Sequence, residues 1–436
     1  MNTPLLDDRE LDELSYHLEH LLRPGTGALG TLAGTSVRYL SGILGAEGVP
    51  CEVVEADGGQ PCLVARLSAH RPDEGLLIVA SGDPIGDIPM EPRRALQGGV
   101  MAAVGLMALA LVRRRELVPS RDIVLAVIPG RGPYTTPRLR DLVARQQNRL
   151  RCRLVLTSDG SAPGTPGNRK LIGIQAASKA FVRVVVRSNA SDLACGPDSA
   201  PLRLLRSLLQ LESGVLATRP CLPATAWLDA VASTLPSRPA AMLRGFQFLG
   251  AGTVLSRFVQ DQDLAATLAS ISRDTAEIVG LRAGEAAGLP AGQAEADVVL
   301  RILPGRRVEE CVLDLASLLG SEVSVEAVDS VLAVETPPMT PLWIHIADAI
   351  EHAIPGALPV PTLSIEPWDA AALAHIETTS YGFGPLSVLD DDELTTPDGT
   401  PGITRESLRR GADAMTRVIL GTCIPNVFPL GQTSSR

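Results

Sequence analysis

The chain has 436 residues, of which 45% are hydrophobic and 20% charged, a composition typical of a globular protein with two or three domains. The formal net charge of −10 argues against nucleic acid or an anionic membrane surface as the main partner. The seven cysteines form no CxxC pair, the acidic N-terminus has no apolar segment, and the longest apolar run, residues 100–112, is too short to span a bilayer. We therefore expect a soluble, cytoplasmic protein with reduced thiols.

The first hundred residues predict two helices followed by strands. Residues 8–22 place leucines on one side of a helix, and residues 36–46 predict a second helix. Between them, the segment GTGALG at 25–30 matches the dinucleotide-binding fingerprint, but it follows a helix instead of a strand, so a loop and helix cap is the better interpretation. Strands are expected at 51–55 and 62–67.

The stretch from 76 to 111 predicts the centre of the molecule. An apolar run at 76–80 indicates a buried strand, a loop rich in Gly, Pro and Asp follows, and a helical pattern starts at Gly98. In an open α/β sheet, ligands bind where strands end and helices begin. Ser81, Asp83 and residues 97–99 stand at such a position.

The rest of the chain alternates between strands and helices. Residues 122–128 and 153–157 indicate buried strands, and residues from 172 alternate as a half-exposed strand does. A helix is expected at 201–211, and residues 296–319 indicate strand, turn and helix. Thr340 and Pro341 open another helix, and a last helix is expected at 405–420.

Five segments in this order resemble one known family. They are Ser81-Gly82-Asp83, Ala95-Leu96-Gln97-Gly98-Gly99, SDLACG at 191–196, the strand–turn–helix at 296–319, and SYGFGP at 380–385. The sequence resembles the zinc-dependent aminoacylases, dipeptidases and succinyl-diaminopimelate desuccinylases (peptidase family M20). The resemblance implies a zinc-exopeptidase-like three-layer α/β/α domain formed by residues 1–172 and 337–436. It also implies an inserted α+β, ferredoxin-like lid and dimerisation domain at 173–336, and hence a homodimer.

The residues that carry the family's chemistry are replaced. The family has His-x-Asp where this chain has Ser81-Gly82-Asp83, and a bridging Asp where it has Ala95. The catalytic Glu-Glu pair corresponds to Gly130-Arg131, and the His that reaches the substrate across the dimer corresponds to Ala194. The loop before the last helix has no His.

A zinc pair needs five or six ligands, usually including two imidazoles, and a bridging carboxylate. None of the six histidines falls at a ligand position, so we expect no metal and no other cofactor. His345 and His352 share a helix face two turns apart, about 10 Å by helix rise, which is too far for both to bind one ion.

The remaining candidates are four carboxylate or guanidinium groups and one hydroxyl. Asp83 and Asp159 are the catalytic candidates, because like charges close together favour the protonated form of one of them, which could act as an acid or base. Asp159 also stands near an acidic ligand of the family. Arg301, Asp369 and Ser81 are the candidates for substrate binding. The alternative is that the carboxylates cap loops and helices and that Arg301 lies on a solvated strand face.

Three functions follow from this resemblance. The first is a protein that has lost the di-zinc site and uses the old site without metal, either for binding or assembly or for a metal-free step of specialised metabolism. The second is an active amide or peptide hydrolase acting on N-acyl amino acids or dipeptides. The third is a structural homodimer that binds nothing. The expected small-molecule partner is amidated or amino-acid-like.

Overall fold

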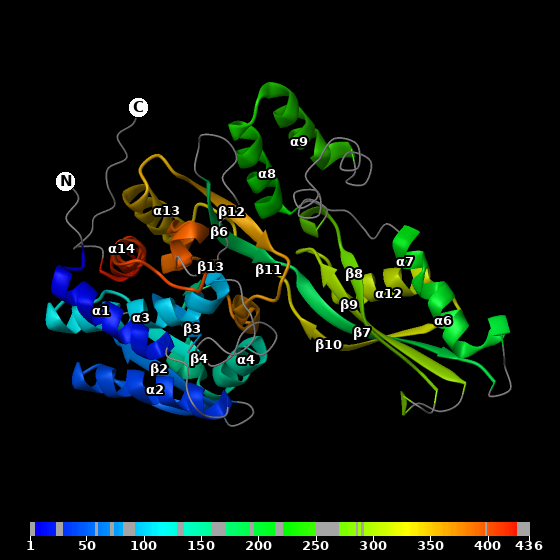
Figure 1. Ribbon diagram of the computed structural model, residues 1–436, viewed down its shortest axis with the longest axis horizontal. Coiled ribbons are helices and arrows are strands. Elements are labelled where there is room, and N and C mark those ends of the chain that lie inside the picture. The colour runs from blue at the N-terminus through cyan, green and yellow to red at the C-terminus, as the bar shows by residue number, and fades with distance from the viewer. Residues whose placement is uncertain are drawn as a thin grey trace. The chain divides into compact units, whose positions relative to one another are not determined.

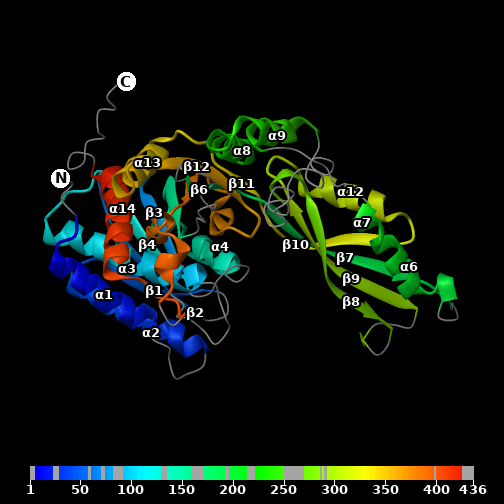
Figure 2. The ribbon, with the colours of Figure 1, turned by 45° about the horizontal axis from the view of Figure 1, so that its top comes forward.

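The protein is described by a computed structural model covering residues 5–22, 29–56, 60–69, 74–81, 92–128, 135–158, 171–191, 196–213, 221–249, 270–284, 287–288, 292–396 and 399–424. The chain divides into two compact units. Unit 1 consists of residues 1–176, 336–362 and 368–436, and unit 2 of residues 177–335 and 363–367. The two units are described separately below (Figures 1 and 2).

Unit 1 is built around one large sheet. Its helices are α1 (Asp8–Leu22), α2 (Leu29–Ala46), α3 (Pro92–Arg114), α4 (Thr135–Arg145), α5 (Gln147–Leu150), α13 (Pro341–Ala353) and α14 (Arg405–Cys423), with the short 3₁₀ helices η6 (Asp369–Leu373), η7 (Pro385–Val388) and η8 (Asp391–Leu394). Its strands are β1 (Cys51–Ala56), β2 (Gln60–Leu67), β3 (Leu76–Ser81), β4 (Ile123–Ile128), β5 (Leu154–Thr157), β6 (Leu171–Ser178), β12 (Leu358–Ser364) and β13 (Thr379–Gly382).

The strand order is β1-β2-β4-β3-β5-β13-β6, and β12 also pairs with β6. The central strands β4, β3, β5 and β13 run parallel, whereas β1, β2 and β6 pair antiparallel with their neighbours. Each parallel connection from β3 to β4 and from β4 to β5 passes through helices, as such crossovers require. The carboxyl ends of the central strands therefore meet at one edge of the sheet, which we call the carboxyl edge, and their starts form the amino edge.

The sheet is buried on both faces, which makes unit 1 a three-layer structure. Alternate residues of β3 and β4 pack on opposite sides: Ile78 and Leu125 contact the layer that includes α1, α2, α3, α13 and α14. Val79 and Val124 contact the layer with α4, α5 and η6. Because both faces are covered, these strands are continuous apolar runs.

Helix α3 is the core helix of unit 1. Residues Leu96–Arg114 are long and apolar enough to span a membrane, but 89% of that stretch is buried inside the protein. Gly105 allows the close approach to the sheet, since a Cβ there would stand 2.8 Å from Leu125 Cδ1. The apolar stretch of this helix is thus used for packing within unit 1.

Unit 2 contains a four-stranded antiparallel sheet of order β10-β7-β9-β8. Helix α6 follows β7 and α12 follows β9, which gives the βαββαβ order of a ferredoxin-like fold. The short strand β11 pairs with the last two residues of β6. The elements of unit 2 are β7 (Ala180–Asn189), η4 (Gly196–Asp198), α6 (Ala200–Leu208), α7 (Gln210–Ser213), α8 (Leu222–Thr234), α9 (Ser237–Leu249), β8 (Thr275–Ala283), β9 (Gln293–Ile302), α12 (Val308–Leu319), β10 (Ser324–Val331) and β11 (Val334–Glu335).

The structure confirms the predicted fold class and corrects two helix boundaries. The second helix starts at Leu29 instead of residue 36, so residues 29 and 30 of the glycine-rich GTGALG segment belong to α2. The helix after the central loop starts at Pro92 instead of Gly98. Proline favours the first position of a helix because its missing N–H has no helical partner there.

Candidate functional site

The parallel strands bring several of the predicted site positions to the carboxyl edge of the large sheet. Ser81, the last residue of β3, pairs with Ile128, the last residue of β4. Val79 pairs with Thr157 at the end of β5, and Thr157 pairs with Gly382 at the end of β13. The chain thus gathers four strand ends at the place where an open α/β sheet binds ligands.

Gln97 connects helix α3 to this edge. Its side-chain Nε2 donates a hydrogen bond to the backbone carbonyl of Ser158, directly after β5. Gly384 also lies against Ser158, since a Cβ at Gly384 would stand 3.3 Å from the Ser158 carbonyl oxygen. Gln97 therefore lies beside the end of β5, and its side-chain amide is used within the protein.

Trp368 packs against the end of β5 at the carboxyl edge. Its ring is fully buried, and its Nε1 donates to Thr157 Oγ1 at 2.7 Å. The backbone N–H of Phe383 donates to the Thr157 carbonyl at 3.1 Å. The hydroxyl oxygen and the carbonyl of Thr157 therefore both accept hydrogen bonds within the protein, as buried polar groups require.

The sequence analysis did not single out Trp368, although one signal was available. The chain has only three tryptophans, and this one follows Pro367 in a loop directly before Asp369. A large aromatic residue with one polar N–H is usually buried with a hydrogen-bond partner. Asp369 itself is half-buried as the first residue of η6, next to the Trp368 that contacts the end of β5.

Arg301 lies in unit 2, on the face of β9 opposite α6 and α12. Its neighbours Leu300 and Ile302 point into the helix-covered core, whereas Arg301 forms an ion pair with Glu277 at 2.6 Å. Its guanidinium carbon also stands 5.7 Å from the centre of the Phe181 ring. These contacts are those of an arginine on a partly solvated strand face.

Several predicted positions lie outside the described residues. These are Asp83, Asp159, Gly130, Arg131 and Ala194. For Ser81 and Ala95 the structure gives the backbone, at the end of β3 and in α3, and nothing of the side chains.

The resemblance implies a zinc pair for the family, and the expectation from the sequence is that this chain has lost it. Within the described ranges, no three His, Cys, Asp or Glu residues lie close enough together to hold a metal ion. At the carboxyl edge, Ser81 and Ala95 occupy the positions that the resemblance aligns with an imidazole and a bridging carboxylate of the family. The described polar groups there, Gln97 and Thr157, have hydrogen bonds within the protein.

The histidines that the structure describes are used in other places, mostly between helices. On α1, His17 Nδ1 lies 2.6 Å from the Tyr39 hydroxyl, and the His20 ring stacks on Tyr39. On α13, His352 Nε2 lies 3.0 Å from an Arg417 nitrogen. Burial lowers the pKa of His17, His345 and His352, mainly because the charged ring would lose its hydration.

No family model and no curated protein matches the chain. Solved structures do match it over nearly its whole length. An M20 family metallo-carboxypeptidase from Sulfolobus solfataricus is 14% identical over 95% of this chain and 99% of its own, with a TM-score of 0.61. YxeP from Bacillus subtilis, a dinuclear metal-binding peptidase of the M20 family, is 11% identical over 95% and 98%, with a TM-score of 0.58.

Human carnosine dipeptidase 1 is similar to the same extent, with 12% identity over 95% of this chain and 97% of its own and a TM-score of 0.56. At such identities the likeness concerns the fold. It agrees with the two units described above, a three-layer unit and a ferredoxin-like unit inserted into its sequence. The chain therefore has the fold of the M20 metallopeptidases.

Proposed function

We propose that this protein is a metal-independent member of the M20 fold, in which the former zinc site has been put to another use. That use is the binding of a small amidated or amino-acid-like molecule, in an assembly role or in a metal-free step of specialised metabolism. The observation that carries the proposal is the chemistry of the carboxyl edge. Ser81 and Ala95 stand where the family has zinc ligands, and Gln97, Thr157 and Trp368 are hydrogen-bonded within the protein.

In this proposal the chemistry belongs to the protein's own side chains. Asp83 and Asp159 are the candidates for moving a proton, and Ser81, Asp369 and Arg301 are the candidates for holding the ligand. Arg301 suits a carboxylate because its planar guanidinium can donate two parallel hydrogen bonds. Replacing Asp159 by Asn should abolish any activity found, and an unchanged activity would remove Asp159 from the proposal.

Elemental analysis tests the loss of zinc. The protein is incubated with zinc sulfate, dialysed against metal-free buffer and analysed by mass spectrometry of the elements. We expect much less than one zinc per chain, and about two per chain would overturn the proposal. The matched control is the variant with Ser81→His and Ala95→Asp, which together with Asp159 supplies three ligands. We expect this variant to retain about one zinc per chain.

An active hydrolase is the second candidate, and the fold itself favours it, because solved structures that match the chain are peptidases. The assay is release of an amino acid from N-acyl amino acids and dipeptides, with and without a chelator. Release that the chelator abolishes would establish metal-dependent hydrolysis. Release that persists with the chelator would instead support the metal-independent proposal.

We also propose that unit 2 mediates a homodimer, which would persist even if the protein had only a structural role. The edge strand β8 exposes Val279 and Leu281, and α6 exposes Leu202 and Leu205. Exposed apolar side chains on an edge strand favour pairing with another chain. Replacing Leu205 and Leu281 together by Glu should halve the mass measured by light scattering, whereas Leu313→Glu on α12, a still more exposed position, should leave it unchanged.

A reducing compartment such as the cytoplasm suits the cysteines. The six described cysteines are all free. Burial raises the pKa of Cys152 to about 12 and that of Cys221 to about 11, so these thiols stay protonated and unreactive at neutral pH.

A further inference from the structure

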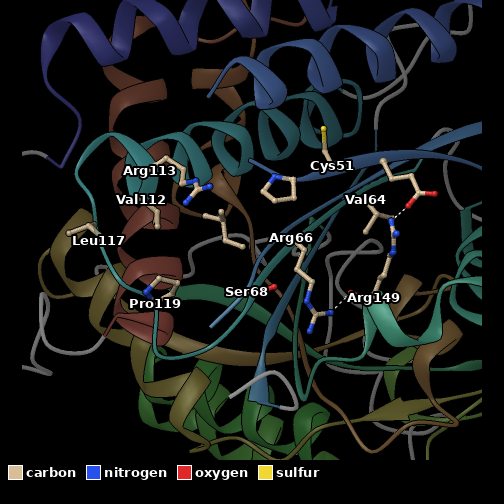
Figure 3. A pocket seen from close by; sticks show the side chains of 12 residues that line it. Cys51, Val64, Arg66, Ser68, Val112, Arg113, Leu117, Pro119 and Arg149 are labelled. Atoms are coloured by element: carbon tan, nitrogen blue, oxygen red, sulfur yellow. Dashed lines mark hydrogen bonds and ion pairs between the residues drawn. The ribbon is translucent and has the colours of Figure 1, made fainter. Parts of the chain in front are cut away.

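Unit 1 contains a pocket of about 860 Å³ at the amino edge of the large sheet, beside the start of β1 and the end of β2 (Figure 3). This volume lies within the range of small-molecule binding sites. Part of its lining is apolar: Leu117 and Pro119 are partly exposed, next to the buried Val64, Leu67 and Val112. The pocket therefore offers an apolar surface to the body of a small ligand.

Three arginines from three different elements also line this pocket. Arg113 comes from the end of α3 and lies on one side of it, and Arg66 of β2 and Arg149 of α5 lie on the other side (Figure 3). A guanidinium group can bind a carboxylate with two parallel hydrogen bonds.

Two of these arginines are held in place by the surrounding backbone and by a buried carboxylate. Arg66 Nε donates to Asp122 Oδ2 at 2.7 Å, and Asp122 is fully buried. Arg66 also donates to the Arg149 carbonyl at 2.5 Å. Arg113 donates from two nitrogens to the Gly48 carbonyl, at 2.6 and 3.1 Å. Because these contacts fix the guanidinium groups before a ligand arrives, binding loses less conformational entropy.

The charges around the pocket do not cancel. Asp122 balances Arg66, and Glu52 forms an ion pair with Arg149. Arg113 has no carboxylate partner within the described part of the chain. The pocket thus keeps one net positive charge, carried by Arg113.

The pocket is distinct from the carboxyl edge described above. The strand register places Leu67, which lines the pocket, beside Ile123, the first residue of β4. Ser81 pairs with Ile128, the last residue of β4. Five residues of extended strand separate the two positions, which corresponds to about 16 Å. A ligand in the pocket would therefore not fill the former zinc site.

We propose that this pocket is a binding site for a small organic acid that combines one carboxylate with an apolar body. The carboxylate is held by Arg113, and the apolar body lies on Leu117 and Pro119, which are partly exposed in the lining. The site is independent of the proposed function, since it requires nothing of Ser81, Asp83 or Asp159.

Isothermal titration calorimetry with octanoate tests the proposal on the full chain. We expect saturable binding to the wild type, weakened about tenfold or more by Arg113→Gln, because a charge-assisted hydrogen bond is lost. Arg145→Gln is the matched control: it removes the same charge from an exposed ion pair on α4 that does not line the pocket, and should leave binding unchanged. Ser68→Phe, at an exposed position of the lining, should block the pocket and abolish binding.

Comparison of octanol with octanoate isolates the contribution of the carboxylate from that of the alkyl group. We expect octanol to bind at least tenfold more weakly than octanoate, because it lacks the charge that Arg113 contacts. Three results would overturn the proposal: no saturable binding of octanoate to the wild type, equal binding to the Arg113→Gln variant, or equal binding of octanol. Thermal unfolding shows whether each variant is folded. We expect the variants at Arg113 and Ser68 to fold, because both side chains are exposed.

Discussion

The two sheets of this protein differ in how many of their faces are buried. In the large sheet of unit 1, β4 is buried at all six positions, and helices cover both faces. In the sheet of unit 2, β9 alternates strictly between buried and half-exposed residues. In the large sheet of unit 1, charged side chains such as Asp122 occur at the strand ends. In the sheet of unit 2 they occur on the face without helices, where Arg187 and Arg282 both pair with Glu295.

This difference predicts where substitutions are costly. A buried side chain at the edge of the large sheet, such as Trp368 or Asp122, is surrounded by protein, so its loss leaves a cavity or an unpaired polar group. A charged side chain on the open face of unit 2 is in contact with water in both the folded and the unfolded state, so its replacement changes the stability little. We therefore expect large effects on stability in unit 1, small ones on the face of unit 2, and an intermediate effect where unit 2 buries a charge.

The largest effect is expected for Trp368→Ala. Removal of this fully buried ring, together with its hydrogen bond to Thr157, should lower the free energy of unfolding by about 3–5 kcal/mol. Urea denaturation measures this, and Leu313→Ala at an exposed position of α12 is the control that should change stability by less than about 0.5 kcal/mol. A loss below about 1 kcal/mol for Trp368→Ala would mean that the carboxyl edge is not closed by this residue.

An intermediate effect is expected at Lys179, the residue of unit 2 between β6 and β7. Its side chain is completely buried. Its Nζ donates to the Arg273 carbonyl at 2.6 Å, and burial lowers its pKa to about 8, against the attraction of Asp274. In the unfolded chain the pKa is about 10.4. Between these two values the unfolded state binds more protons, so the stability of the wild type should rise with pH.

Comparison with Lys179→Met isolates this group. From pH 8 to 10 the wild type should gain about 1–3 kcal/mol relative to the variant, measured by urea denaturation. Cys221, whose pKa burial raises to about 11, titrates in the opposite sense, but it is present in both proteins and cancels. Parallel pH profiles would show that Lys179 keeps its ordinary proton affinity in the folded protein.

The sequence predicted the elements whose periodicity depends on burial. The leucines of residues 8–22 predicted a helix, and α1 has these bounds, with Leu11, Leu14, Leu18 and Leu21 buried. The start of α2 was wrong by seven residues, because its first turns contain Gly30 and Gly34, which weaken a helical pattern.

The site could be predicted only in part, for a physical reason. Parallel strands bring their ends together by a general rule, so the meeting of Ser81 with the ends of β4 and β5 follows from the strand pattern. The contact of Trp368 with Thr157 joins residues 211 positions apart, and that of Arg66 with Asp122 joins residues 56 apart. Such pairs depend on tertiary packing, which no local periodicity records.

The smallest effect is expected for the ion pair of Arg301 with Glu277, whose side chains are 31% and 52% exposed. A double-mutant cycle with Arg301→Gln and Glu277→Gln should give a coupling energy of about 0.2–1 kcal/mol, because water screens charges on an open face. The coupling should fall further in 1 M salt. A coupling above about 2 kcal/mol would place the pair in a desolvated environment, and the contrast between the two sheets would then fail at this position.

If Arg301 also holds a ligand carboxylate, as proposed, Arg301→Gln should weaken ligand binding far more than it lowers stability. Glu277→Gln should leave that binding intact or strengthen it, since it frees the guanidinium for the ligand.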